Sequence, residues 1–211
     1  MSEIRIKSLL VGMVQTNCYL VYDEETKRGV IIDPGDSANL ISSKCKEFGI
    51  KPEAILLTHG HFDHILAARE LKEEWNVKIY SSEKEVEILE DGSKNMMLKW
   101  FRKAFSLTPD VTLTDGETFE LAGFTWKMLL TPGHTIGSCC YYIEEEEVLF
   151  AGDTLFQNSY GRIDLPTGNA MDMVASVKKL LTLPEDVMVY PGHMDVTTIG
   201  HEKKYNPLAR Y

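Results

Sequence analysis

The chain has 211 residues, of which 44% are hydrophobic and 26% are charged, and we expect one globular domain over 1–211. The formal net charge of −10 argues against binding of a phosphate backbone, so we expect no nucleic-acid partner. No apolar run reaches the length of a signal-peptide core or a membrane span. This predicts a cytoplasmic protein without a membrane partner and leaves the oligomeric state open.

The first half of the chain is predicted to start with strands and to continue with helices and strands. Ile4 and Ile6 alternate with polar residues, and we expect a turn at Gln15-Thr16-Asn17 before the next apolar run. Such closely spaced strands favour an antiparallel start to a sheet. Further strands are predicted at 18–22, 29–33, 54–57 and 77–80, and helices at 37–48, 65–75 and 84–89.

The segment 92–109 is apolar but lacks a clear period, which is compatible with a helix or a mobile flap. Beyond it, alternation predicts strands at 111–113, 117–121, 124–130, 139–143, 148–151 and 187–190, and a helix at 170–181. The acidic run 144–147 is predicted as a solvated hairpin tip. Strands thus precede a helix in each of two comparable halves. This order predicts the α+β class, as an αββα sandwich with helices on the outer faces of two packed sheets.

The cysteines match neither a zinc ribbon nor a redox pair in their spacing. Cys139 and Cys140 are neighbours on an expected strand, so their side chains point to opposite faces. We therefore expect free thiols in a reducing compartment, at the positions Cys18, Cys45, Cys139 and Cys140.

Histidines and acidic residues gather where strands are predicted to end. Three of the six histidines lie in the run His59-Gly-His61-Phe-Asp63-His64. His134 and His193 each follow a Pro-Gly pair, and Asp153 follows Ala-Gly. Several strand ends can converge on one point, which a metal site requires. The candidate ligands are His59, His61, Asp63, His64, His134, Asp153 and His193.

Seven ligands exceed the needs of one tetrahedral ion but suit two ions that share a carboxylate. Imidazole and carboxylate ligands favour zinc, with iron or manganese as alternatives. The sixth histidine, His201, is expected at the surface. Asp33, at another strand end, is either a group that orients a ligand histidine or a plain turn residue.

The run His59-Gly-His61-Phe-Asp63-His64 resembles the His-x-His-x-Asp-His signature of the metallo-β-lactamase superfamily, and the resemblance extends over nearly the whole chain. It implies one metal on His59, His61 and His134 and another on Asp63, His64 and His193, with Asp153 between them. The segments 152–156 and 161–164 are similar to the glyoxalase II (hydroxyacylglutathione hydrolase) branch, in its short single-domain form.

Full-length glyoxalase II carries a C-terminal helical domain that binds glutathione, and we expect no room for it after His193. Lys203, Lys204 and Arg210 could compensate only part of its charge. Glutathione is therefore less certain as part of the substrate than the hydrolytic centre itself.

The resulting hypothesis is hydrolysis of a thioester, such as S-lactoylglutathione or a related hydroxyacyl thioester, by a hydroxide that bridges two metals. It gives catalytic roles to His59, Asp63 and Asp153, and a substrate-binding role to Arg162. The partner is a small molecule. The main alternative is persulfide dioxygenase chemistry at one iron. A lactonase or other small-ester hydrolase is a further alternative, weakened by Phe156 where such enzymes carry a tyrosine. β-Lactam hydrolysis, nuclease activity and a module without catalysis are less favoured.

Overall fold

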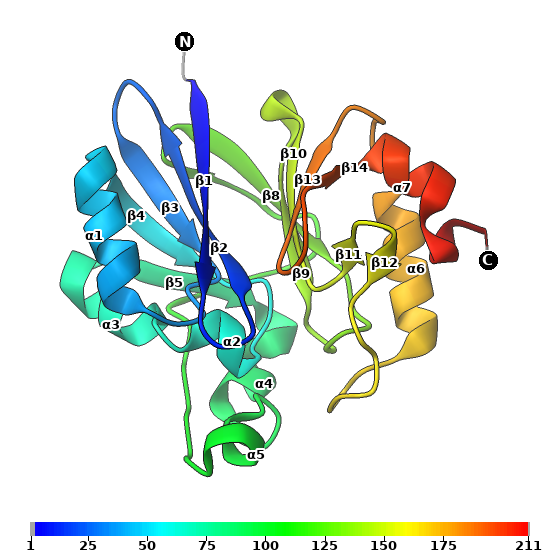
Figure 1. Cartoon of the computed structure of the whole chain (residues 1–211), viewed down its shortest axis with the longest axis horizontal. Coiled ribbons are helices and arrows are strands. Elements are labelled where there is room, and N and C mark those ends of the chain that lie inside the picture. The colour runs from blue at the N-terminus through cyan, green and yellow to red at the C-terminus, as the bar shows by residue number, and fades with distance from the viewer. Residues whose placement is uncertain (1–2, 211) are drawn as a thin grey trace.

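The computed structural model describes residues 3–210, which form two packed sheets with helices on both outer faces (Figure 1). The first sheet has the order β1-β2-β3-β4-β5-β6. Its strands are β1 (Ile4–Val11), β2 (Thr16–Asp23), β3 (Arg28–Ile32), β4 (Lys51–Leu56), β5 (Lys78–Ser82) and β6 (Val111–Leu113). β1 to β3 pair antiparallel and β3 to β6 pair parallel, so the predicted antiparallel start is confirmed.

The second sheet has the order β14-β13-β10-β9-β8-β7. Its strands are β7 (Thr118–Leu121), β8 (Phe124–Leu130), β9 (Cys139–Ile143), β10 (Val148–Gly152), β13 (Met188–Pro191) and β14 (Thr197–Thr198). β10 and β13 pair parallel, and the other neighbours pair antiparallel. β8, β10 and β13 therefore run in the same direction and end at the same edge. A small hairpin, β11 (Leu155–Phe156) with β12 (Ser159–Tyr160), follows β10.

The helices lie in two outer layers and at one end of the sandwich (Figure 1). They are α1 (Ala38–Phe48), α2 (Phe62–Ile65), α3 (Ala68–Trp75), α4 (Val86–Glu90), α5 (Met97–Phe101), α6 (Ala170–Leu180) and α7 (Ile199–Tyr205). Short 3₁₀ turns occupy Glu83–Glu85, Glu144–Glu146 and Pro207–Arg210. None of the helices within residues 3–210 is long and apolar enough to cross a bilayer.

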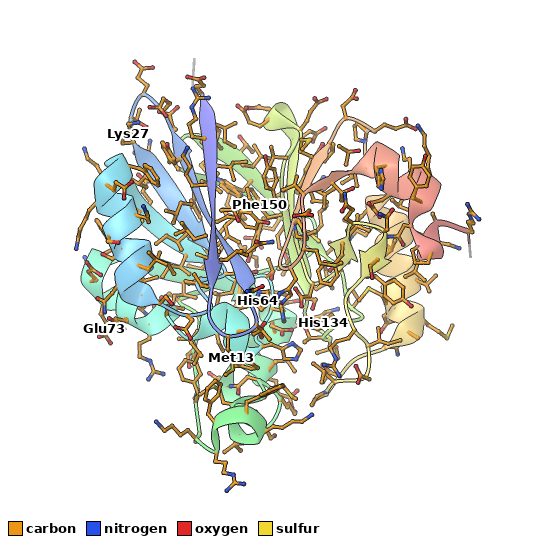
Figure 2. All side chains as sticks on the ribbon, viewed as in Figure 1. Met13, Lys27, His64, Glu73, His134 and Phe150 are labelled. Atoms are coloured by element: carbon orange, nitrogen blue, oxygen red, sulfur yellow. The ribbon has the colours of Figure 1, made fainter. Side chains whose placement is uncertain are left out.

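Strand β2 shows how the sequence produces the layers, because all eight of its residues are buried. Cys18 and Leu20 pack toward α1 and α3, whereas Tyr19 and Val21 pack between the two sheets. Side chains alternate across a strand, so a strand that is apolar on both faces requires cover on both sides. A third core lies between the second sheet and α6. Figure 2 shows Phe150 between the sheets and His64 and His134 near one end of them.

The predicted αββα sandwich is therefore confirmed, while some local boundaries were wrong. Thr16 and Asn17 do not form the turn, because they already pair with β1, and the turn occupies 12–15. The helix expected over 65–75 is divided into α2 and α3. Segment 92–109 contains the one-turn helix α5 within irregular chain. The hairpin β11–β12, strand β14 and helix α7 were not predicted.

The four cysteines are free thiols, as expected. Cys139 packs between the two sheets and Cys140 packs on the side of α6, so the neighbours do face opposite directions. Burial raises the pKa of both thiols. His201 is half-buried rather than fully exposed, and its Nε2 lies 2.8 Å from Asn158 Oδ1.

Candidate metal centre

The seven predicted ligands converge at one end of the two sheets, where Figure 2 labels His64 and His134. His59 and His61 follow β4, and Asp63 and His64 belong to the first turn of α2. His134, Asp153 and His193 follow β8, β10 and β13, whose carboxyl ends share one edge of the second sheet. The first sheet therefore contributes one compact run, and the second contributes one residue from each of three strand ends.

The first group of ligands consists of imidazoles alone. His59, His61 and His134 each offer a nitrogen, and these nitrogens lie within 4.8 Å of one another. His61 Nδ1 lies 2.8 Å from His134 Nε2. His134 Nδ1 lies 2.7 Å from the carbonyl oxygen of Arg162, to which it donates, so Nε2 of the neutral ring carries the lone pair. We call these three residues the three-histidine half-site.

The second group contains a carboxylate. Asp63, His64 and His193 also offer atoms within 4.8 Å of one another. His193 Nε2 lies 3.3 Å and His64 Nε2 lies 3.5 Å from Asp63 Oδ2. We call these residues the aspartate half-site.

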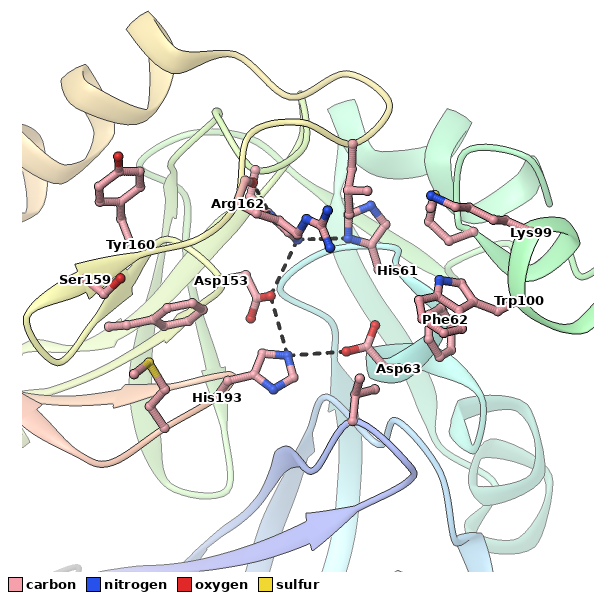
Figure 3. Close-up of a pocket in the computed structure, with 16 residues that line it drawn as sticks. His61, Phe62, Asp63, Lys99, Trp100, Asp153, Ser159, Tyr160, Arg162 and His193 are labelled. Carbon is pink, nitrogen blue, oxygen red and sulfur yellow. Dashed lines mark hydrogen bonds and ion pairs between the residues drawn. The ribbon is translucent and has the colours of Figure 1, made fainter.

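Asp153 lies between the two half-sites. Its carboxylate oxygens lie 3.5 Å from His64 Nε2 and 3.5 Å from His134 Nε2, and Oδ2 lies 3.6 Å from His193 Nε2 (Figure 3). The backbone of the β13 loop approaches closely, since a Cβ on Gly192 would lie 2.3 Å from Asp153 Oδ1 and 2.8 Å from His64 Cε1. Any larger residue at position 192 would displace the carboxylate.

Several polar atoms of the cluster are buried without a hydrogen-bond partner among residues 3–210. They are His59 Nε2, His61 Nε2, His64 Nε2 and Asp153 Oδ1. Unsatisfied buried polar atoms are costly and rare, so a group of them on side chains of the types that bind metals fits a cation site. The donor set, imidazoles and carboxylates in two groups, fits divalent metal ions.

The electrostatics of the two half-sites differ. Burial and the neighbouring imidazoles lower the pKa of His59 well below its usual value, so its ring is neutral and available as a ligand. Burial also opposes the charge of His64, but Asp63, Asp153 and Asp33 outweigh it and raise the pKa of His64 to about 10. Burial would raise the pKa of Asp63, yet His64 and His193 hold it below its usual value. The aspartate half-site therefore favours positive charge more strongly.

Asp33 contacts a candidate ligand, which favours the first of the two alternatives that the sequence left. Its Oδ2 lies 2.9 Å from His64 Nδ1, and its two oxygens accept hydrogen bonds from the amide and hydroxyl of Thr58 at 2.8 and 2.6 Å. The Thr58 hydroxyl in turn lies 3.2 Å from His59 Nδ1. A carboxylate behind a ligating imidazole fixes its ring and increases its basicity.

A pocket of about 380 Å³ opens over the ligands (Figure 3). Phe62 and Trp100 line one side and Tyr160 lines the other, and the apolar lining also includes Met96, Phe156 and Leu165. The predicted substrate-binding residue Arg162 lies at its edge, where its guanidinium donates two hydrogen bonds of 2.7 Å to Asp164. Lys99 is the second cation of the wall.

Sequence reasoning missed three residues that fix the loops. Asn17 donates hydrogen bonds of 3.0 Å to the carbonyls of Pro191 and Met194, on both sides of His193. Thr16 donates one of 3.1 Å to Asp63 Oδ2. Glu85 is buried against the histidine loops. Threonine, asparagine and glutamate are common turn and surface residues, so only the fold reveals these roles.

Comparison with known proteins gives the family. The family model described as "Metallo-beta-lactamase superfamily" matches residues 11–193. The chain belongs to the metallo-β-lactamase superfamily. The match spans all seven candidate ligands, from the histidine run to His193, and superfamily members bind two metal ions.

Three similar proteins define its neighbourhood. The relative "Hydroxyacylglutathione hydrolase GloC" of Haemophilus influenzae is 37% identical and covers 97% of this chain and 98% of its own length. The solved structure "BLEG-1 B3 metallo-beta-lactamase" is 38% identical, with a TM-score of 0.93, and covers 98% of this chain and 100% of its own. "TTHA1623 in a di-iron-bound form" is 35% identical, with a TM-score of 0.84 and coverages of 95% and 98%. Each is similar over nearly its whole length, but their names differ in activity and metal.

Proposed function

We propose that this metallohydrolase cleaves a thioester, such as S-lactoylglutathione or a related hydroxyacyl thioester. The name of the 37% identical relative, hydroxyacylglutathione hydrolase, supports this substrate class. The observation that carries the proposal is the pair of complete half-sites that meet at Asp153 beneath a pocket of about 380 Å³. Two complete sets of candidate ligands support hydrolysis over the single-iron dioxygenase chemistry, which needs only one set. The proposed substrate is a small molecule in the cytoplasm, handled by one domain.

His59, His61 and His134 would hold one divalent metal ion and Asp63, His64 and His193 the other, with Asp153 shared. We propose zinc as the native metal, with iron or manganese as alternatives. When bound, such ions lower the pKa of a water molecule to about 7 and polarise the carbonyl that is attacked.

The side chains of the site orient these groups and hold charge. Asp33 fixes the ring of His64, and the carbonyl oxygen of Arg162 fixes the ring of His134. Asp63 stays ionised and receives a hydrogen bond from Thr16, so its carboxylate is available as an acceptor at the pocket floor. No serine or cysteine nucleophile is required, because a water activated by the metal ions would supply the nucleophile and the thiolate of a thioester would leave readily.

The walls of the pocket support a substrate with apolar and anionic parts. Trp100 and Tyr160 offer aromatic surface on opposite sides. Lys99 has no ion-pair partner within residues 3–210, whereas Arg162 is engaged with Asp164. Lys99 is thus available to receive a carboxylate of the acyl or thiol part, and Arg162 would have to share its guanidinium with Asp164. We propose that Lys99 and Arg162 bind that end of the substrate.

The test is metal analysis of protein purified without added metal, together with a panel of thioesters, a lactone and a persulfide. We expect two divalent ions per chain, thioester turnover, and no oxygen uptake. Lys99→Ala should raise KM for an anionic thioester about tenfold and leave KM for a neutral one unchanged, consistent with the loss of one charge-assisted contact. One iron per chain with persulfide-dependent oxygen uptake would establish the dioxygenase alternative instead.

A further inference from the structure

Glu85 is a fully buried glutamate that the proposed chemistry does not use. It ends the 3₁₀ turn Glu83–Glu85 after β5, and its exposed fraction is 0%. Burying a carboxyl group without compensating hydrogen bonds is strongly unfavourable, above all when the group is charged. A carboxyl group retained at such a position therefore has partners of structural importance.

Both loops that carry the three-histidine half-site donate hydrogen bonds to this carboxyl group. The amide of Gly60 donates to Oε1 at 2.8 Å, and the hydroxyl of Thr135 donates to Oε2 at 2.9 Å. The amide of Gly137 is a third donor. Gly60 stands between His59 and His61, and Thr135 directly follows His134. One carboxyl group thus links the backbone segments of all three histidines.

The fit around Glu85 leaves no space for another arrangement. A Cβ on Gly137 would lie 2.3 Å from the Glu85 amide nitrogen and 2.5 Å from Oε2. The loop can therefore come this close to Glu85 only with a glycine at position 137. Burial raises the pKa of Glu85 to about 8, against the three donors, which lower it. The two amides donate whether or not the carboxyl group is ionised, so the link persists in both forms.

The aspartate half-site has different supports. Thr16 and Asn17 from β2 hold Asp63 and the His193 loop, and Asp33 holds His64. Glu85 has no hydrogen bond to any of these segments within residues 3–210. Its influence should therefore be confined to one half of the metal centre.

We propose that Glu85 is a positioning residue that sets the spacing of His59, His61 and His134, and thereby the metal affinity of the three-histidine half-site. This inference rests on the metal-binding part of the proposed function and not on the thioester substrate. Mutation of a residue that hydrogen-bonds to metal-ligating residues typically weakens metal affinity about 10- to 100-fold. The carboxyl group touches no ligand atom, so it acts only through the loops.

The test measures Zn²⁺ affinity of each half-site separately, by competition with a chelator. The backgrounds are His193→Ala, which leaves the three-histidine half-site, and His59→Ala, which leaves the aspartate half-site. Glu85→Gln keeps the side-chain volume but replaces one acceptor oxygen by an NH₂ group. This group cannot accept a hydrogen bond from the donors that surround Glu85. We expect about 10- to 100-fold weaker Zn²⁺ binding in the first background and less than about threefold in the second.

Glu202 offers a matched control for general loss of stability. It too is 0% exposed, and it accepts hydrogen bonds from the Asn158 amide at 3.0 Å, the Thr197 hydroxyl at 2.7 Å and the Asn206 side chain at 2.9 Å. Its partners lie in the turn of the β11–β12 hairpin, in β14 and directly after α7, outside the two loops that carry the three-histidine half-site. Glu202→Gln should lower the unfolding midpoint as Glu85→Gln does, but leave the Zn²⁺ affinity of the three-histidine half-site, measured in the first background, unchanged.

Three results would overturn the proposal: unchanged affinity in Glu85→Gln, equal weakening in both backgrounds, or the same weakening in Glu202→Gln. Cobalt absorption of the first background provides a second readout, because displaced imidazoles change the coordination geometry and its spectrum. None of these measurements uses a thioester. A failure of the thioester hypothesis therefore leaves this proposal standing, and the reverse also holds.

Discussion

The three-histidine half-site and the aspartate half-site meet at Asp153 but are built differently. The first joins a loop of the first sheet to a loop of the second through the carboxyl group of Glu85, which lies outside both loops. The second is held directly by β2, whose Thr16 and Asn17 reach Asp63 and the His193 loop. The three-histidine half-site offers only imidazoles, whereas the aspartate half-site also offers a carboxylate. The difference shows that the two half-sites of one centre are held largely by different side chains, with Asp33 in contact with both.

Loss of Asp153 should weaken both half-sites together, so that they no longer differ in their response. Its oxygens lie 3.5 Å from both His64 Nε2 and His134 Nε2. Asp153→Ala is expected to weaken metal binding at both half-sites and to lower kcat/KM for a thioester by at least about 10³-fold, since several kcal/mol of stabilisation by the metals is lost. Metal content after gel filtration and steady-state kinetics check this. Retention of one tightly bound ion with high activity would mean that the half-sites work alone.

Asp33 should affect both half-sites, though less severely. It contacts His64 directly and His59 through the Thr58 hydroxyl. Asp33→Ala is expected to weaken Zn²⁺ affinity about 10- to 100-fold at the aspartate half-site and by a smaller factor at the other. Chelator competition in the single-half-site backgrounds measures both values. An effect confined to the three-histidine half-site would contradict this assignment.

Asn17 should affect the aspartate half-site alone, with the smallest effect. It holds only the backbone around His193, through the carbonyls of Pro191 and Met194. Asn17→Ala is expected to weaken Zn²⁺ binding there by about tenfold, at the low end for supporting groups, and to leave the three-histidine half-site unchanged. Together with Glu85→Gln, this gives opposite selectivity in the same assay. Equal losses in both backgrounds would show that the two supports are coupled.

The sequence predicted the parts of the site whose chemistry is visible in residue type. Histidines and aspartates after apolar runs gave all seven residues that the structure gathers, and their metal-binding roles stay predictions. Alternation gave most strands, and repetition of strands before a helix gave the sandwich.

The residues that escaped prediction depend on tertiary contacts. Glu85 belongs to a polar turn in which the neighbouring Lys84 is exposed. Nothing in the local sequence distinguishes the buried residue from the exposed one. Asn17 was assigned to a turn because asparagine favours turns, whereas its side chain in fact holds a loop some 170 residues away in sequence. The strands β11 and β12 have two residues each, too few for any period to appear.

The contacts of β2 have a consequence for the order in which this protein assembles. Tyr19 and Asn17 bind the carbonyl of Pro191 at 2.6 and 3.0 Å, across sequence separations of 172 and 174 residues. Contacts across such long sequence separations carry a large loop-closure cost, which slows their formation. The aspartate half-site cannot exist until the two sheets have docked. During refolding from denaturant, the rate of metal uptake by that half-site would therefore report the rate at which the two sheets dock.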